Sequence, residues 1–576
     1  MMKKISRAIA LSSLALAALA STGCEQPNWG DPAYISQQLE QKDPAARRVA
    51  LGHLEALPDD KKREVVPALT KVYMEKDANQ KAIIDMLVVM RDPKAKDAYL
   101  EEVKSNAGGK AGAAAEALGE AKAKDAIPAM LELLDKTDDP DVKQGILRGF
   151  TYMPDPSMVP GLLKLLALDV DNNPISLHAY SCEILGNLAQ EQPQALDKDA
   201  REALVRGIFL SNNMRQSTDK QCGLAVQQLG APAIPTLIKT YKGEFEPVQK
   251  LMLAYKFSSN RPKGVATTRL VAMRAKEAAP LFLEDIQAKK ELPEAETVSR
   301  DRSINYLTME AQTVSEEILG LGDLGTPEAK DVLVKAIKGE LDENWEELKN
   351  AVGLLIIVQL HQNAATALNR IGDRSAAPAL LEAAQDFKTF SALTENLIAV
   401  AKHNKTEVPD AVTLYGYNIV VAQAYAYLAD ASGKDAYVKW VDGLGKDMAG
   451  LKKELDKFKP LFDMQAECGG KGDPKAQAAC YGEKLKSDDE YTRAKAVYEI
   501  ARLPSEAAAP VLAANAGIDK LNTRELVTFA LYRHPSKEAV AKVEETLEKE
   551  KDRSGMDYKL DQRRLQMLAA WLKNNS

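Results

Sequence analysis

Residues 320–325 (GLGDLG) have the glycine spacing of a dinucleotide-binding loop. Such a loop must directly follow a strand, because the glycines then bring backbone amides close to the pyrophosphate. Here the helical segment SEEIL comes first, and Asp323 would place a negative charge beside the phosphates. The motif therefore predicts a turn between two helices, and we expect no cofactor.

His178 and Cys182 stand four residues apart, a spacing that suits metal ligation from one helix face. The remaining histidines are scattered along the chain, at His53, His361, His403 and His534. No Ser/His/Asp or Cys/His set is formed by neighbouring residues, although such sets are spatial rather than sequential. We favour helix packing for this pair, and predict no metal site, no catalytic residues and no enzyme.

Two pairs of cysteines suit disulfides. Cys468 and Cys480 flank a Gly-Gly-Lys-Gly segment that can fold back, and closing this loop would be worth about 3 kcal/mol. Cys182 and Cys222 are expected on the second helices of successive hairpins, where they either pair across the stack or stay as two buried thiols.

The first 23 residues read as a signal peptide, with Lys3, Lys4 and Arg7 before an apolar stretch at 8–20. Residues 21–24 (STGC) resemble the lipobox of bacterial lipoproteins, in which the cysteine is lipidated and becomes the first residue. Ser21 departs from the usual leucine, and cleavage after Ala20 is the alternative. The resemblance implies a lipid anchor at Cys24 and a short tether at 24–30. It also leaves an even number of cysteines for an oxidising compartment.

The net charge of the exported chain and the residue after Cys24 bear on its binding partners and cellular location. Removing residues 1–23 changes the formal net charge from −7 to −10, which argues against general nucleic-acid binding. Residue 25 is glutamate rather than the aspartate that retains enterobacterial lipoproteins at the inner membrane. We therefore expect a cell-envelope protein, lipid-anchored, at the outer membrane.

A group of tyrosines follows residue 414 and is the candidate partner-binding surface. Tyrosine supplies amphipathic contact area at protein interfaces. Filling of the core between helices is the interpretation that we favour, and a partner-binding surface is the alternative. The group comprises Tyr415, Tyr417, Tyr425 and Tyr427.

These residues must be positioned by a repeating unit. A sequence unit recurs along the chain, most clearly at 114–134 and 367–380. It begins with an Ala-Leu pair and a short polar turn, and continues with a small or apolar residue, a proline and an apolar helix. Proline is tolerated in the first helical turn, where its missing N–H has no partner. Such units must stack to bury their apolar faces. We predict helical hairpins throughout, and aspartate N-caps where Asp-Pro opens a helix, at Asp92, Asp139 and Asp155.

This unit is similar to the phycobilisome-lyase-type HEAT-like repeat, and the chain resembles a bacterial HEAT-repeat lipoprotein. The resemblance implies an all-α, HEAT-like α-solenoid of about a dozen helical hairpins over residues 31–573. We expect one solenoid part at 31–466, with insertions near 242–261 and 387–414, and C-terminal hairpins at 467–576. Residues 435–464 are predicted to form one or two long helices.

The function expected is a scaffold or protein–protein binding platform that is held at the membrane by its lipid and binds another envelope protein along a concave face. Two alternatives stay open. The chain could bind cell-wall glycan or another small ligand, or it could be the accessory subunit of an envelope enzyme.

Overall fold

The computed structural model describes residues 27–212, 214–255, 261–290, 300–348, 351–389, 391–407 and 409–576. Within these ranges the regular structure is helical, and one isolated bridge joins Ser211 to Ser217. The predicted all-α class is confirmed. None of the helices in this part of the chain is long and apolar enough to cross a membrane. The predicted signal peptide at 1–23 and the lipidation site Cys24 lie outside the described residues.

The chain forms two compact units, one ending at Ile184 and the other running from Leu185 to Ser576. The boundary lies within helix α11 (Ile175–Glu191). The division that we predicted between residues 466 and 467 falls inside the second unit.

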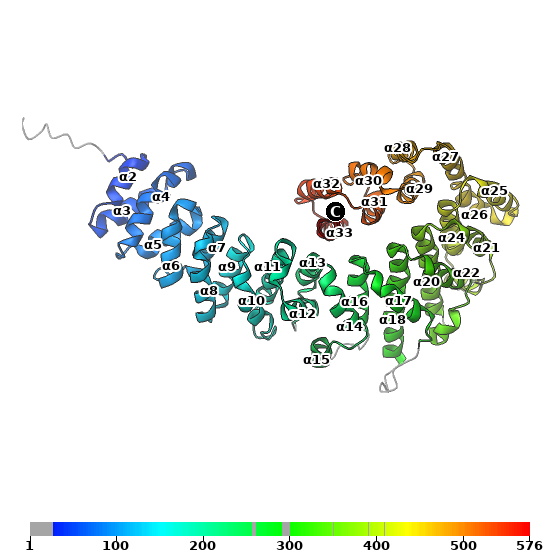
Figure 1. Cartoon of the computed structure of the whole chain (residues 1–576), viewed down its shortest axis with the longest axis horizontal. Helices are drawn as coiled ribbons and strands as arrows, with labels where there is room; N and C mark the ends of the chain where they lie inside the picture. Colours follow the sequence, from blue (N-terminus) through cyan, green and yellow to red (C-terminus); the bar gives the residue numbers. More distant parts are fainter. Residues whose placement is uncertain are drawn as a thin grey trace, which may run out of the picture. The chain divides into compact units, whose positions relative to one another are not determined.

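The first unit is built from consecutive helices joined by short turns (Figure 1). They are α2 (Pro32–Leu39), α3 (Pro44–Glu55), α4 (Asp59–Met74), α5 (Gln80–Met90), α6 (Lys96–Ser105), α7 (Ala111–Glu120), α8 (Ile127–Lys136), α9 (Pro140–Thr151) and α10 (Val159–Leu166). The predicted aspartate caps are confirmed. The side chains of Asp92, Asp139 and Asp155 each accept a hydrogen bond of 2.9 Å from the backbone amide two residues ahead.

Helices α7 and α9 approach each other backbone to backbone through four glycines. A Cβ atom on Gly145 would lie 2.7 Å from the Cα atom of Gly112, and one on Gly119 would overlap the backbone of Gly149. Contacts this short leave no room for a side chain, so these positions require glycine. The small-residue sequence of α7 (AGAAAEALGE) thus sets the distance between the two helices.

The second unit continues the pattern from α12 to the C-terminus. Its helices are α12 (Lys198–Gly207), α13 (Asp219–Leu229), α14 (Ile234–Tyr241), α15 (Glu246–Tyr255), α16 (Arg261–Ala272), α17 (Ala279–Gln287), α18 (Arg300–Leu324), α19 (Lys330–Ile337), α20 (Ala351–Ile371), α21 (Ala377–Gln385), α22 (Ser391–Asn404), α23 (Ala411–Leu414), α24 (Gly416–Leu428), α25 (Lys434–Asp442), α26 (Ala449–Asp456), α27 (Lys459–Gly469), α28 (Pro474–Lys484), α29 (Glu490–Ala501), α30 (Ser505–Ala514), α31 (Leu521–Arg533), α32 (Lys537–Glu550) and α33 (Met556–Asn575).

Two local predictions for this unit were wrong. Residues 435–464 form parts of α25, α26 and α27 rather than one or two long helices, since the chain turns at Gly443 and again before Pro460. The glycines of 320–325 do not all form a turn, because α18 continues to Leu324 and only Gly325 has a positive φ, of 65°. Both predicted insertions contain helices: α15 lies within 242–261, and α22 and α23 lie within 387–414.

The C-terminal hairpins of the second unit return to its beginning, so that α33 lies beside α13 (Figure 1). The indole of Trp571 donates a hydrogen bond of 3.2 Å to the carbonyl oxygen of Met273, and Asn574 donates one of 3.1 Å to that of Gln228. On α31, Arg533 donates one of 2.7 Å to the carbonyl oxygen of Gly322. The returning hairpins therefore cover parts of α13 and of the end of α18.

Candidate functional site

The four tyrosines predicted as a partner surface lie on or directly before α24. Tyr417, Tyr425 and Tyr427 are buried, while Tyr415 is half-buried. The Tyr417 hydroxyl group donates a hydrogen bond of 3.1 Å to the carbonyl oxygen of Ile337. Tyr425 packs in a cluster of aromatic rings. The structure therefore places these two inside the core rather than on an exposed face.

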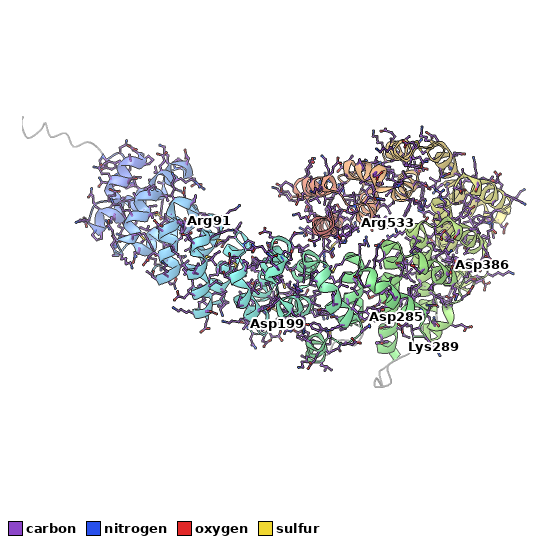
Figure 2. The ribbon with its side chains drawn as sticks, viewed as in Figure 1. Arg91, Asp199, Asp285, Lys289, Asp386 and Arg533 are labelled. Atoms are coloured by element: carbon purple, nitrogen blue, oxygen red, sulfur yellow. A yellow bond between two sulfur atoms is a disulfide. The ribbon has the colours of Figure 1, made fainter. Side chains whose placement is uncertain are left out.

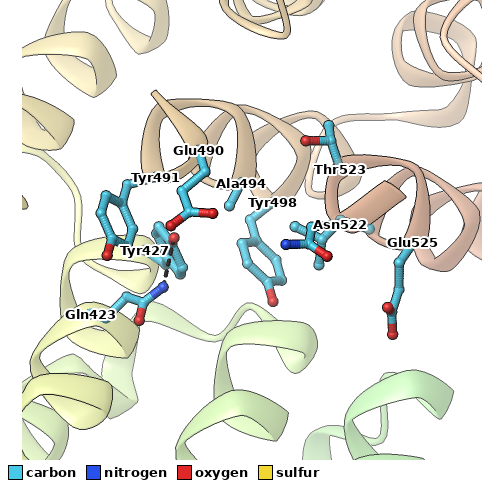
Figure 3. Close-up of a pocket in the computed structure, with 10 residues that line it drawn as sticks. Gln423, Tyr427, Glu490, Tyr491, Ala494, Tyr498, Asn522, Thr523 and Glu525 are labelled. Carbon is cyan, nitrogen blue, oxygen red and sulfur yellow. Dashed lines mark hydrogen bonds between the residues drawn. The ribbon is translucent and has the colours of Figure 1, made fainter. Parts of the chain in front are cut away.

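Tyr427 lines a cavity of about 400 Å³ between α24, α29 and α31, which we call the tyrosine pocket (Figure 3). Tyr427 and Tyr498 form buried walls, each 6% exposed, with ring centroids 5.4 Å apart. Gln423 donates a hydrogen bond of 2.8 Å to the Tyr427 hydroxyl group. The lining residues are Gln423, Tyr427, Glu490, Tyr491, Ala494, Tyr498, Asn522, Thr523, Glu525 and Leu526. Tyr415 and Tyr417 line a separate cavity of about 560 Å³.

Two carboxylates give the tyrosine pocket a negative charge. Glu525 forms an ion pair of 3.1 Å with Arg564, whereas Glu490 makes no ion pair within the described ranges. Aromatic rings attract cations to their faces, and a carboxylate nearby strengthens that preference. The pocket is thus suited to a cationic side chain.

A buried ion network fixes the wall that carries Tyr427. The ammonium group of Lys495 donates hydrogen bonds to the carbonyl oxygens of Tyr427 and Ala429, at 3.0 and 2.9 Å, and pairs with Glu499 at 2.8 Å. Arg502 also donates to the Tyr427 carbonyl oxygen, at 3.0 Å. The end of α24 is therefore held against α29 by the buried Lys495 and Glu499 and the partly exposed Arg502.

These charges shift the pKa values of both partners. Burial lowers the pKa of Lys495 to about 8, and repulsion by Arg502 adds to the shift. Burial alone would raise the pKa of Glu499, but Lys495, Arg502 and Arg374 outweigh it and hold that pKa below its usual range. The carboxylate is charged at neutral pH, while the lysine releases its proton in mildly alkaline solution.

This shift makes the stability of the second unit depend on pH. Between pH 8 and 10.5 the unfolded lysine keeps a proton that the folded one has released, so the unfolding free energy rises with pH. From about pH 7.5 to pH 9.5, we expect a rise of about 1–2 kcal/mol relative to Lys495→Met. Denaturant titrations of both proteins at several pH values check this. Parallel pH profiles would contradict it.

The cysteines fall into two groups. Cys468 and Cys480 form a disulfide, with Cα atoms 5.5 Å apart, between α27 and α28. Their sulfurs, with Glu467, are the one group of three potential metal ligands found in the described part of the chain, and the disulfide already uses both sulfurs. Cys182 and Cys222 are buried, one in each unit, and their pairing stays a prediction.

Sequence reasoning missed most of the tyrosine pocket. Tyr491 and Tyr498 stand seven residues apart on α29, a spacing that places both on one face of a helix. That periodicity could have predicted that the two rings lie together. No local pattern in the sequence predicts that α24, which is distant along the chain, packs against α29.

Comparison with known families and structures identifies the repeat. The PBS lyase HEAT-like repeat family matches residues 111–136 and 361–386, one copy in each unit. No curated protein sequence matches the chain. Among solved structures, importin β in a polyethylene glycol condition covers 99% of this chain and 74% of its own, at 10% identity and a TM-score of 0.37. Yeast importin-β (Kap95p) covers 94% and 74%, at 9% identity and a TM-score of 0.32. Nothing about partners follows from likenesses this distant.

Proposed function

We propose that this HEAT-like solenoid is a scaffold that binds another protein of the cell envelope through its tyrosine pocket. The observation that carries the proposal is the combination of three tyrosine rings with Glu490, a carboxylate that makes no ion pair with any described residue. Tyrosine contributes strongly to binding energy at protein interfaces. A lysine or arginine side chain of the partner would enter the pocket, with its charge near Glu490 and its methylene groups against the rings.

The cell-envelope address is part of the same proposal and rests on the sequence. The charged and apolar segments of residues 1–23, followed by the lipobox-like STGC, support export and a lipid on Cys24. Glu25 favours the outer membrane. We assign no catalytic residues, and the accessory-subunit alternative differs only in the identity of the partner.

The test is cross-linking in intact native cells, followed by isolation from the membrane fraction and mass spectrometry. We expect one envelope protein to be recovered near stoichiometry with the wild type. The double variant Glu490→Lys/Tyr491→Ala should recover at least tenfold less of it, because charge reversal and loss of a ring remove the two features that select a cation.

The matched control is Tyr152→Ala, which removes a 47% exposed tyrosine from the first unit. It should recover the same partner in full. Equal recovery by the double variant, with folding retained by circular dichroism, would remove the tyrosine pocket as the contact site. Wild-type protein found only in the soluble fraction would contradict the lipid anchor.

A further inference from the structure

A second and larger cavity lies where α33 meets α13, apart from the tyrosine pocket. Its volume is about 700 Å³, and we call it the arginine pocket. It is lined by side chains from α13, α18, α31, α33 and the turn after α16. Those that matter here are Gln227, Arg274, Asp323, Tyr532, Arg533 and Trp571.

The charges in the arginine pocket do not balance. Asp323 forms ion pairs of 2.7 Å with both Arg274 and Arg370. Arg533 makes no ion pair in the part of the chain that the structure describes; it donates to the carbonyl oxygen of Gly322 and lies 4.8 Å from the Phe529 ring centroid. Arg533 belongs to α31 (labelled in Figure 2), and its hydrogen bond to the Gly322 carbonyl oxygen directs it toward α18. Arg533 is therefore a cation without a carboxylate partner among the described residues. Lys276 and Glu277, which are exposed, add one charge of each sign to the lining.

The surroundings make that charge costly. Burial lowers the pKa of Arg533 to about 10, and although Asp323 opposes the shift, repulsion by Arg274, Arg502 and Arg370 adds to it. The Nε atom of Arg533 is also buried without a hydrogen-bond partner. A half-buried cation of this kind is stabilised when an anion enters the site.

A neutral group in the same cavity also lacks a partner. Gln227 is 1% exposed, and its Nε2 atom donates a hydrogen bond of 3.0 Å to the carbonyl oxygen of Ala272. This bond fixes the orientation of the amide, so that Oε1 is an acceptor, and Oε1 is buried without a hydrogen bond. An unsatisfied buried acceptor costs about 1–3 kcal/mol, so a ligand hydroxyl group that reaches Oε1, after a small shift of the side chains that cover it, gains affinity.

Two aromatic rings complete the lining. Tyr532 and Trp571 lie with ring centroids 5.2 Å apart, and the Arg274 guanidinium carbon lies 4.1 Å from the Tyr532 centroid. The indole N–H of Trp571 is occupied by the Met273 carbonyl oxygen, so this side chain offers a ligand its ring rather than a hydrogen bond. Such rings suit the apolar face of a sugar ring.

We propose that the arginine pocket binds a small acidic sugar. Its carboxylate or phosphate would pair with Arg533, a hydroxyl group would donate to Gln227 Oε1, and its ring would lie against Trp571 and Tyr532. The site is separate from the tyrosine pocket, so this proposal does not depend on protein binding there.

Isothermal titration of the mature protein with four probes tests the ligand class. Glucuronic acid and glucose 6-phosphate carry both features, glucose lacks the charge, and inorganic phosphate lacks the hydroxylated ring. We expect at least one acidic sugar to bind at least tenfold more tightly than glucose or phosphate. Tighter binding of glucuronic acid would identify the anionic group as a carboxylate, and tighter binding of glucose 6-phosphate would identify it as a phosphate. If neither acidic sugar binds, or phosphate binds equally well, the proposal is overturned.

Variants then locate the site. Arg533→Gln should weaken binding of the acidic sugar at least tenfold, while Arg533→Lys, which keeps the charge, should restore part of it. Gln227→Met, which keeps the length without the acceptor, should weaken binding and quench less tryptophan fluorescence on titration. The matched control is Arg553→Gln, since Arg553 also lies over a ring (5.2 Å from the Tyr558 centroid) but outside the pocket. Unchanged affinity in both Arg533→Gln and Gln227→Met would overturn the assignment.

Discussion

Replacing Asp323 by asparagine is expected to destabilise the second unit by about 3–5 kcal/mol, the cost of removing one partner from a buried ion pair. Burial would raise the pKa of Asp323, but Arg274 and Arg370 outweigh it and keep that pKa below its usual range, so the carboxylate is charged. Asparagine has the same shape but leaves both guanidinium groups without a counterion. Arg533, which repels them, is close by.

Denaturant-induced unfolding, followed by circular dichroism, measures this cost. Asp331→Asn is the control, because Asp331 lies on α19 of the same unit with its side chain 85% exposed, and it should leave the unfolding midpoint unchanged. A loss of less than 1 kcal/mol in Asp323→Asn would mean that water reaches the two arginines and replaces the carboxylate.

In the first unit, Gly119→Ala is expected to destabilise by about 3 kcal/mol, the upper part of the range for overpacking. The added Cβ would overlap the carbonyl group and Cα atom of Gly149, which are backbone and cannot turn aside. Helices α7 and α9 would have to separate. Thermal unfolding of the first unit provides the measurement.

Gly52→Ala serves as the control, and we expect it to raise the unfolding free energy rather than lower it. Gly52 lies within α3 and has no heavy atom within 4 Å of the position its Cβ would take. Alanine there should stabilise by about 0.5–1 kcal/mol, because it restricts the unfolded chain and favours helix. Stabilisation by both substitutions would show that α7 and α9 adjust their spacing freely.

Local signals in the sequence were sufficient to predict the helices and their starts. Asp-Pro pairs place a side-chain acceptor next to a residue that favours the first helical turn, and neither effect depends on distant parts of the chain. The prediction failed at 435–464, where Gly443, Gly445 and Pro460 each marked a break that helical periodicity alone concealed. It failed at 320–325 because Gly320 and Gly322 serve close packing against Val271 and Ala367 within a helix.

The sites were less predictable than the elements. Tyr427 was selected by residue type, and it does line a cavity, but its neighbours Tyr491 and Tyr498 come from a helix more than 60 residues later. The Asp323–Arg370 and Arg374–Glu499 pairs likewise join residues 47 and 125 positions apart. In a solenoid such contacts depend on small rotations that accumulate from repeat to repeat, and one sequence does not specify them.

The return of α33 to α13 also has a consequence in time. An open array of repeats can fold as it is made, because each repeat needs only its neighbour. Here α13 is synthesised more than 300 residues before α33. At about 5–20 residues per second, the surface of α13 that α33 covers would wait roughly 20–70 s for its partner. Over that interval the nascent protein exposes apolar and charged surface that the finished one buries, so it depends most on protection from aggregation just before its last helix is complete.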